Sequence, residues 1–184
     1  MSEKFSKELN KFFGKIGLDK ELQKRLYNTV ELSDVADIAN ELGFTVSAAD
    51  IIKAQAGRIQ ESPKDQLDIL AAGKKPHTVA QWGRGGKGFL EAAGYWFVEL
   101  LRFSNESFCE NEQLIFFIKR LKSDQLLQKK ITRLKTFNEL YNFIKECDCS
   151  VTLYDLINYQ ARVIESLDEN EANRVASGSK GISN

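Results

Sequence analysis

The pattern of residues 41–52 returns 105 residues later at positions 146–157. The first stretch reads ELGFTVSAADII and the second reads ECDCSVTLYDLI. Each predicts the end of one helix, a short extended link and a new helix, capped by Ser47 with Asp50 or by Thr152 with Asp155. The cap hydroxyl accepts the unpaired N–H of the third helical residue, and the carboxylate favours the positive end of the helix. This repetition constrains the architecture and names no reaction.

The correspondence continues on both sides of this stretch without a gap. Residues 9–59 and residues 114–164 share thirteen identities at the same offset of 105. Chance matching of two helical segments would not keep caps and apolar positions in phase. We therefore predict a tandem duplication. In the first segment the shared residues are Leu9, Phe12, Asp19, Leu22, Gln23, Lys24, Glu41, Val46, Asp50, Ile52, Gln55, Ala56 and Ile59.

Helix is the expected element throughout, because the chain has only two prolines and no long alternating strand pattern. Apolar residues at three-to-four spacing predict about five short helices in each copy, and such helices must bury their apolar faces against one another. The predicted fold is all-α. Its repeats occupy residues 1–73 and 107–178, a basic loop and an apolar helix join them over residues 74–106, and residues 179–184 form a flexible tail.

Local signals predict several helix ends. Ser33 is expected to begin the third helix, and Gly43 is expected to close it with a left-handed backbone. Ser107 with Glu110 predicts a capping box that opens the second copy. Asp148 stands at the position equivalent to Gly43, which predicts a less well specified helix end.

The connection between the copies is basic and rich in glycine. Residues 74–88 hold four glycines and no acidic residue, and they predict a mobile loop. A phosphate-binding loop is disfavoured, because no Gly-Lys-Ser/Thr ending follows and no strand precedes it. The next segment, Phe89 to Phe103, predicts a strongly apolar helix. We expect it to be wedged between the copies as shared core, and contact with a membrane surface is the alternative.

Composition disfavours several classes of function. The 26 basic and 26 acidic side chains cancel, so nucleic-acid binding has no general support. Cys109, Cys147 and Cys149 lack a zinc-ligand spacing, and the single histidine, His77, lies beside no carboxylate or thiol. We therefore predict no catalytic site, no metal site and no cofactor. A start without a secretory apolar core, and the lack of a run of ~18 apolar residues, favour a cytoplasmic protein.

Both copies resemble the Nif-eleven domain, a leader-peptide domain of precursors of ribosomally synthesised, enzymatically modified peptides. In the first copy the resemblance is carried by Asp19, Leu22, Gln23, Leu26, Ile38, Ala39, residues 43–47, Asp50 and Ile51. In the second it is carried by Asp124, Leu127, Gln128, Ile131, Val151, Thr152, Asp155 and Leu156. The resemblance implies a helical handle that a modifying enzyme grips, and a transporter-linked protease that cuts after small residues.

Two small-residue endings resemble the cleavage signal of such leaders. They are Ala72 with Gly73 and Ser177 with Gly178. Neither is a true Gly-Gly, and the six residues after Gly178 contain no cysteine, so a precursor of cysteine-based rings fits badly. Exposed apolar side chains are expected to contact the partner's groove. These partner-binding residues are Leu22, Leu26, Phe44, Ile51, Leu127 and Ile131.

Two functions follow from these patterns. The first is a non-catalytic leader-type recognition protein, resembling precursors of the bacteriocin or lanthipeptide type, whose partner is a peptide-modifying enzyme or a peptidase transporter. The alternative is a tandem helical adaptor, or regulatory binding protein, that has no core peptide and uses two binding faces to raise avidity. An enzyme is the third and least favoured interpretation.

Overall fold

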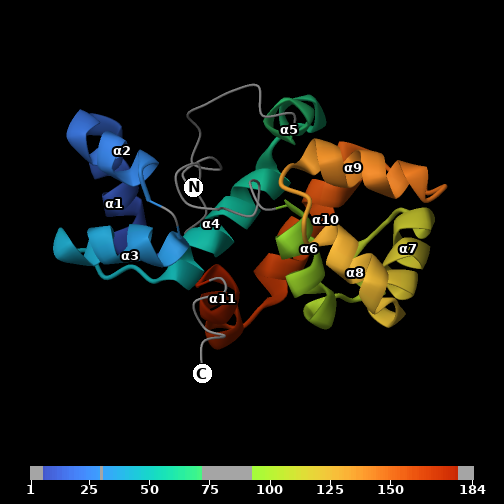
Figure 1. Cartoon of the computed structure of the whole chain (residues 1–184). Helices are drawn as coiled ribbons and strands as arrows, with labels where there is room; N and C mark the ends of the chain where they lie inside the picture. Colours follow the sequence, from blue (N-terminus) through green and yellow to red (C-terminus); the bar gives the residue numbers. More distant parts are fainter. Residues whose placement is uncertain (1–5, 30, 72–92, 178–184) are drawn as a thin grey trace.

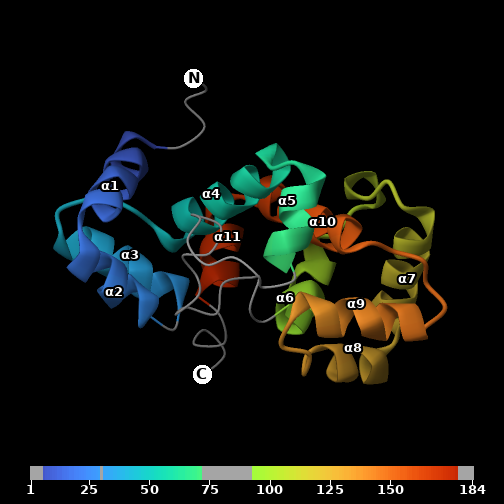
Figure 2. The ribbon, with the colours of Figure 1, turned by 90° about the horizontal axis from the view of Figure 1, so that it is seen from above.

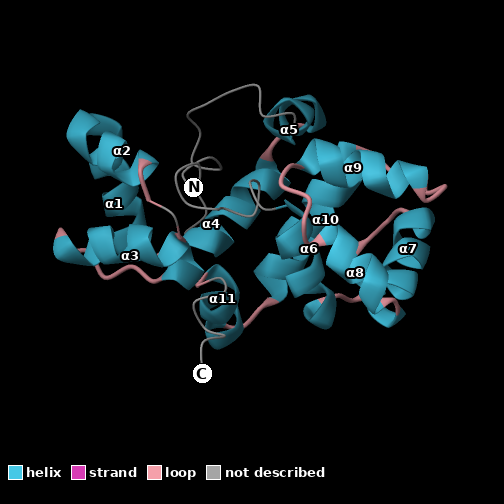
Figure 3. Ribbon diagram, in the orientation of Figure 1, coloured by secondary structure: helices cyan, strands magenta, loops and turns pink. Residues whose placement is uncertain are grey.

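The fold of the protein was examined in a computed structural model, which describes residues 6–29, 31–71 and 93–177. Every regular element among these residues is a helix, and no strand occurs among them (Figure 3). The prediction of an all-α fold is therefore confirmed. The loop expected over residues 74–88 and the tail expected over residues 179–184 lie outside the described residues.

The helices of the two halves of the chain begin at matching positions in the sequence. The first half forms α1 (Lys7–Leu18), α2 (Lys20–Tyr27), α3 (Leu32–Glu41), α4 (Ala48–Glu61) and α5 (Lys64–Ala71). The second half forms α6 (Ala93–Leu100), two short 3-10 helices, η2 (Leu101–Phe103) and η3 (Glu106–Phe108), then α7 (Glu112–Ser123), α8 (Gln125–Ile131), α9 (Phe137–Glu146), α10 (Leu153–Ser166) and α11 (Glu169–Ala176). Helices α7 to α11 each begin 105 residues after helices α1 to α5.

The two predicted capping boxes are present at the longest helices. At α4 the Asp50 N–H donates to Ser47 Oγ over 3.1 Å, and the Ser47 N–H donates to Asp50 Oδ2 over 2.8 Å. At α10 the Asp155 N–H donates to Thr152 Oγ1 over 3.1 Å, and the Thr152 N–H donates to Asp155 Oδ2 over 2.7 Å. Local sequence therefore determines where both long helices begin.

Two other predicted helix starts are wrong. Helix α3 begins at Leu32 rather than at Ser33, because the Glu31 carboxylate serves as its cap in a box with Asp34. Helix α7 begins at Glu112, and Ser107 lies in η3 instead of opening a capping box. The Asn111 side chain caps α7, since its oxygen accepts two N–H groups of the first turn.

The ends of α3 and α9 share an unusual backbone conformation. Gly43 has a φ of 85° and Asp148 has a φ of 59°, both in the left-handed region. Glycine enters this region without steric cost, and aspartate enters it more readily than most residues. The substitution of glycine by aspartate therefore leaves the helix end where the first half has it.

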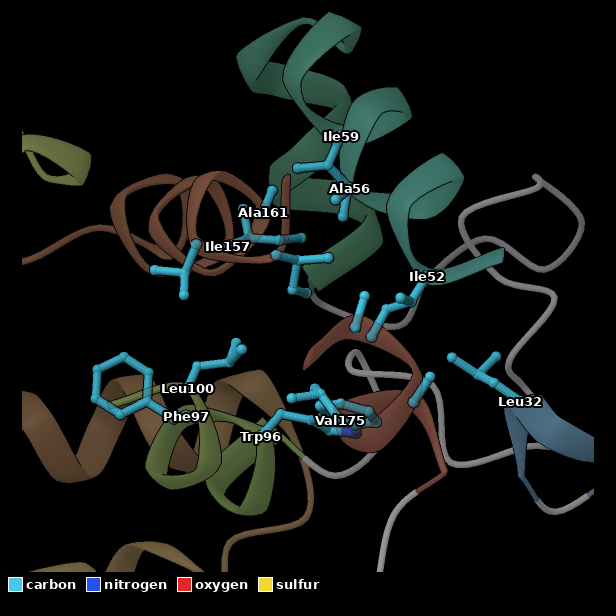
Figure 4. Packing of buried hydrophobic residues seen from close by; sticks show 14 of the residues in the cluster. Leu32, Ile52, Ala56, Ile59, Trp96, Phe97, Leu100, Ile157, Ala161 and Val175 are labelled. Carbon is cyan, nitrogen blue, oxygen red and sulfur yellow. The ribbon is translucent and has the colours of Figure 1, made fainter. Parts of the chain in front are cut away.

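The centre of the molecule is the crossing of α4 and α10 (Figure 1). Figure 4 shows Ala56 and Ile59 of α4 facing Ala161 of α10, and all three side chains are fully buried. Small alanine side chains let two helix backbones approach closely, and buried isoleucine fills the space beside them. The two halves therefore share one core, and this core runs through the longest helix of each half.

The last helix of each half packs on the long helix of the other half. Helix α11 lies against α4, and helix α5 lies against α10. Leu67 of α5 and Ala172 of α11, which stand at equivalent positions, are both buried. Between α11 and α4, the Ala49 N–H donates to Asn173 Oδ1 over 2.9 Å. Each half thus packs its last helix on the long helix of the other half, and we call this arrangement the exchange of α5 and α11.

Helix α6 belongs to the core of the second half. It packs mainly against α8, α9 and α10, and its side chains Trp96, Phe97 and Leu100 are buried. A β-carbon added at Gly94 would lie 1.8 Å from the Ile131 carbonyl oxygen, so only glycine permits this approach. Residues 93–100 of the predicted apolar segment are helical, their main contacts are with helices of the second half, and residues 89–92 lie outside the described residues.

Candidate functional site

The predicted partner-binding residues lie in the core rather than on the surface. Leu22, Leu26, Ile51, Leu127 and Ile131 are buried, and Phe44 is half-buried with its ring 5.6 Å from the ring of Phe12. The expectation that these side chains are exposed is therefore wrong for the five aliphatic residues. Helical periodicity marked the inward face of each helix, and in this fold that face is already covered by neighbouring helices.

The predicted cleavage-like residues are only partly described by the structure. Ala72, Gly73 and Gly178 lie outside the described residues. Ser177 is half-buried at the end of α11, where its N–H and its hydroxyl donate to the Asn173 carbonyl over 2.9 and 2.7 Å. These bonds hold Ser177 in the last turn of the helix.

Within the described ranges, four large apolar side chains are exposed instead. Leu18 is 91% exposed and Leu42 is 39% exposed, at the ends of α1 and α3. Phe116 of α7 and Leu126 of α8 are 71% and 73% exposed. The sequence carried a signal for Phe116, because it falls outside the buried stripe formed by Leu114, Phe117, Ile118 and Leu121. A large apolar residue on the polar face of a helix is expected to be exposed, so the exposure of Phe116 could have been predicted.

A groove of about 460 Å³ lies between α7 and the connection from α9 to α10. Its lining consists of Glu112, Gln113, Phe116, Phe117, Arg120, Cys147, Asp148 and Cys149. The Cys149 thiol donates to the Gln113 carbonyl over 3.2 Å. Burial raises the pKa of the Cys149 thiol above its ordinary value, so it is protonated at neutral pH. A protonated, hydrogen-bonded thiol is a poor nucleophile, and this arrangement does not resemble a cysteine-based catalytic site.

Several acidic side chains act as helix caps. Asp19 accepts the Leu22 N–H over 3.0 Å, and this bond, together with Lys15, lowers the pKa of the Asp19 carboxyl. Across the described ranges, no three His, Cys, Asp or Glu side chains are grouped so that they could hold a metal ion. His77 lies outside these ranges. None of the described helices has the length and apolar character needed to span a bilayer.

The described residues form a small all-α structure in which several polar side chains cap helices. Residues 6–51 match the Nif11 domain. The matched segment covers α1, α2, α3 and the beginning of α4. No curated protein and no solved structure matches the chain.

The match supports one part of the predicted family relationship. Residues 6–51 are similar to the Nif11 domain, a domain found in leader-like precursors of ribosomally synthesised, post-translationally modified peptides. Residues 112–176 are not covered by the match.

Proposed function

We propose that this protein is a non-catalytic recognition protein of the leader-peptide type, built from two copies of a Nif11-like unit. The observation that carries the proposal is the Nif11 match at residues 6–51. It is supported by the position of this unit, since α1, α2 and α3 project from one end of the molecule (Figure 2). A projecting helical unit is accessible to the groove of a partner protein.

The second copy corresponds to residues 112–176. Its five helices begin at the same offset as those of the first half, and the left-handed residues Gly43 and Asp148 stand at equivalent positions. The buried polar side chains Gln55 and Gln160 are equivalent as well. The agreement in helix starts, in left-handed residues and in buried polar residues supports a duplication.

The proposed contact surface of the first unit contains Leu18 and Leu42. Both are exposed, whereas Leu22 and Leu26 are needed to hold α2 in place. A partner helix or groove that covers Leu18 would remove a large apolar side chain from water, which is the usual driving force of helix-in-groove recognition. The proposed partner is a peptide-modifying enzyme or a peptidase transporter, in the cytoplasm.

Coexpression with a maturation enzyme encoded beside its gene tests this function. The expected result is a complex that survives purification, and Leu18→Asp is expected to weaken it at least tenfold, because a charge would have to be buried. Lys24→Asp places the same carboxylate at an exposed position that is already charged, so it buries no new charge and serves as the control. An unchanged mass together with no detectable complex would remove the proposal.

A tandem adaptor without a core peptide is the second candidate function. The observation that favours it is the exchange of α5 and α11, because both small-residue endings follow helices that the folded body needs. In an adaptor the chain would persist intact in the producing cell. Intact mass spectrometry distinguishes the two functions, since a precursor would be cut near Gly73 or Gly178.

A further inference from the structure

Helix α8 and the turn that follows it carry an exposed stripe of one leucine and three basic residues. The α8 stripe consists of Leu126, Lys129 and Lys130 of the helix and of Arg133, two residues beyond its end, and all four are exposed. Spacings of three and four residues place Leu126, Lys129 and Lys130 on one face of the helix. The opposite face of α8 holds the buried residues Leu127 and Ile131, so the stripe points away from the core.

The positive charges of the stripe have no acidic partner among the described residues. In the part of the chain that the structure describes, no carboxylate lies within 4.0 Å of the Lys129, Lys130 or Arg133 cationic groups. The carboxylates nearest in sequence are engaged with backbone: Asp124 accepts the Leu127 N–H over 2.9 Å, and Glu139 accepts the Lys135 N–H over 2.6 Å. The stripe therefore keeps a concentrated positive charge on a chain whose net charge is zero.

The equivalent positions of the first half have a different chemistry. They are Glu21, Lys24, Arg25 and Asn28, and Arg25 forms an ion pair with Glu41. The first half thus carries an acid, one lysine and an ion-paired arginine at these positions, whereas the second half carries a leucine and three bases without a carboxylate partner among the described residues. Since both helices fold alike, the helix itself does not require the α8 stripe.

We propose that the α8 stripe docks on an anionic lipid surface. An anionic bilayer offers phosphate and carboxylate groups to the lysines and the arginine, and an apolar layer just beneath them to Leu126. This inference does not rest on the proposed leader-type function, because it is argued only from the charge and exposure of the α8 stripe.

Two other classes of partner fit the stripe less well. A nucleic acid would neutralise the charges but would leave Leu126 in water, and the stripe has no aromatic side chain on which a base could stack. An acidic peptide needs a groove for its side chains, and the groove beside α7 is lined by none of the four stripe residues. A convex helix face with charge around one leucine matches a flat surface best.

The position of α8 allows such docking. In Figure 2 the helix lies at the edge of the molecule, so its outer face can approach a plane without a clash with α4 or α11. The long lysine and arginine side chains can reach headgroups while Leu126 enters the boundary of the acyl layer. With three cations and one leucine, the attachment is expected to be reversible and to weaken with salt.

Vesicle cosedimentation of the full chain tests the proposal. The probes are vesicles of phosphatidylcholine alone and of an equal mixture of phosphatidylcholine and phosphatidylserine, at low and high salt. Binding is expected only to the mixed vesicles at low salt. Lys129→Gln with Lys130→Gln is expected to lower the partition coefficient about 25-fold, from about fivefold for each charge near an anionic surface. Leu126→Ser is expected to lower it about tenfold, through lost apolar burial.

The first half supplies the matched control. Lys24→Gln with Arg25→Gln removes the same charge at the equivalent positions, and it should change vesicle binding less than about twofold, because these residues lie on the other half. An equal loss in this control would show that binding follows net charge, and would overturn the proposal. It would also be overturned by no binding to the mixed vesicles, or by binding to a single-stranded oligouridine that Leu126→Ser leaves unchanged.

Discussion

Gly43 and Asp148 occupy equivalent positions in the two halves, and each ends a helix with a left-handed backbone. Both have a positive φ, and a β-carbon in this region costs about 1 kcal/mol more than glycine does. At Gly43 a β-carbon would meet no atom within 4 Å, so the cost there is one of backbone conformation alone. Asp148 therefore holds a strained position that its equivalent in the first half does not.

A glycine at position 148 is expected to stabilise the protein. Asp148→Gly removes the left-handed strain, and part of this gain is offset by the greater freedom of glycine in the unfolded chain, so we expect a net increase of about 0.5 kcal/mol in the free energy of unfolding. The reverse change, Gly43→Asp, should lower it by a similar amount. Urea denaturation of the two variants measures both values, and a loss of stability in Asp148→Gly would contradict the account.

Helix α6 is held in position by a close backbone contact at its N-terminal end. The Gly94 N–H donates to the Leu134 carbonyl over 3.1 Å, and the Gly94 α-carbon faces the Ile131 carbonyl, which ends α8. The rest of the helix brings Phe97 against Phe117 and Tyr159, with ring centroids 6.5 and 5.7 Å apart. Backbone contact at one end and aromatic packing along the helix hold α6 in the second half.

Substitution of Gly94 is expected to displace α6. In Gly94→Ala the new β-carbon would meet backbone atoms of Ile131 and Leu134 that cannot rotate away, and overpacking of this kind costs about 1–3 kcal/mol. Gly14→Ala is the control, because Gly14 lies in α1 with no atom near an added β-carbon, and alanine there should stabilise the helix by up to about 1 kcal/mol. Thermal unfolding should move in opposite directions for the two variants.

The exchange of α5 and α11 makes the two halves one folding unit at the scale of the whole molecule. Each half covers the long helix of the other with its own last helix. Lys64 of α5 lies 5.3 Å from the ring centre of Tyr154 in α10, and the Lys53 ammonium group of α4 donates to the Leu167 carbonyl. A half on its own would leave the apolar face of its long helix in water.

Cutting the chain between Ala71 and Ala93 should therefore not separate the halves. With a protease site placed in this segment, the two fragments are expected to elute together from a size-exclusion column at the volume of the intact chain, because apolar burial across α4 and α10 holds them. Denaturation in urea before the run should separate them and controls for complete cutting. Two separately eluting, folded fragments would show that each half is stable alone.

Much of the fold could be predicted from local patterns, whereas the site could not. The capping boxes at Ser47 and Thr152 and the apolar spacings predicted the long helices, because both depend on residues within one turn. The sequence predicts a partner surface at Leu22 and Leu127, which are buried. Apolar residues at helical spacing have the same sequence pattern whether their face contacts another chain or the protein's own core. The exposure of Leu18 and Leu126 was not predicted, because neither residue belongs to the periodic apolar face of its helix.

The sequence by itself determined the helical class, the positions at which the long helices begin and the matching offset between the two halves, since hydrogen bonds and caps are made by near neighbours. Only the tertiary structure decided that α5 and α11 exchange places, that α6 enters the second half and that the predicted contact residues are buried. These features depend on which apolar faces meet over long distances in the chain. Periodicity shows that a face must be covered, and packing alone selects what covers it.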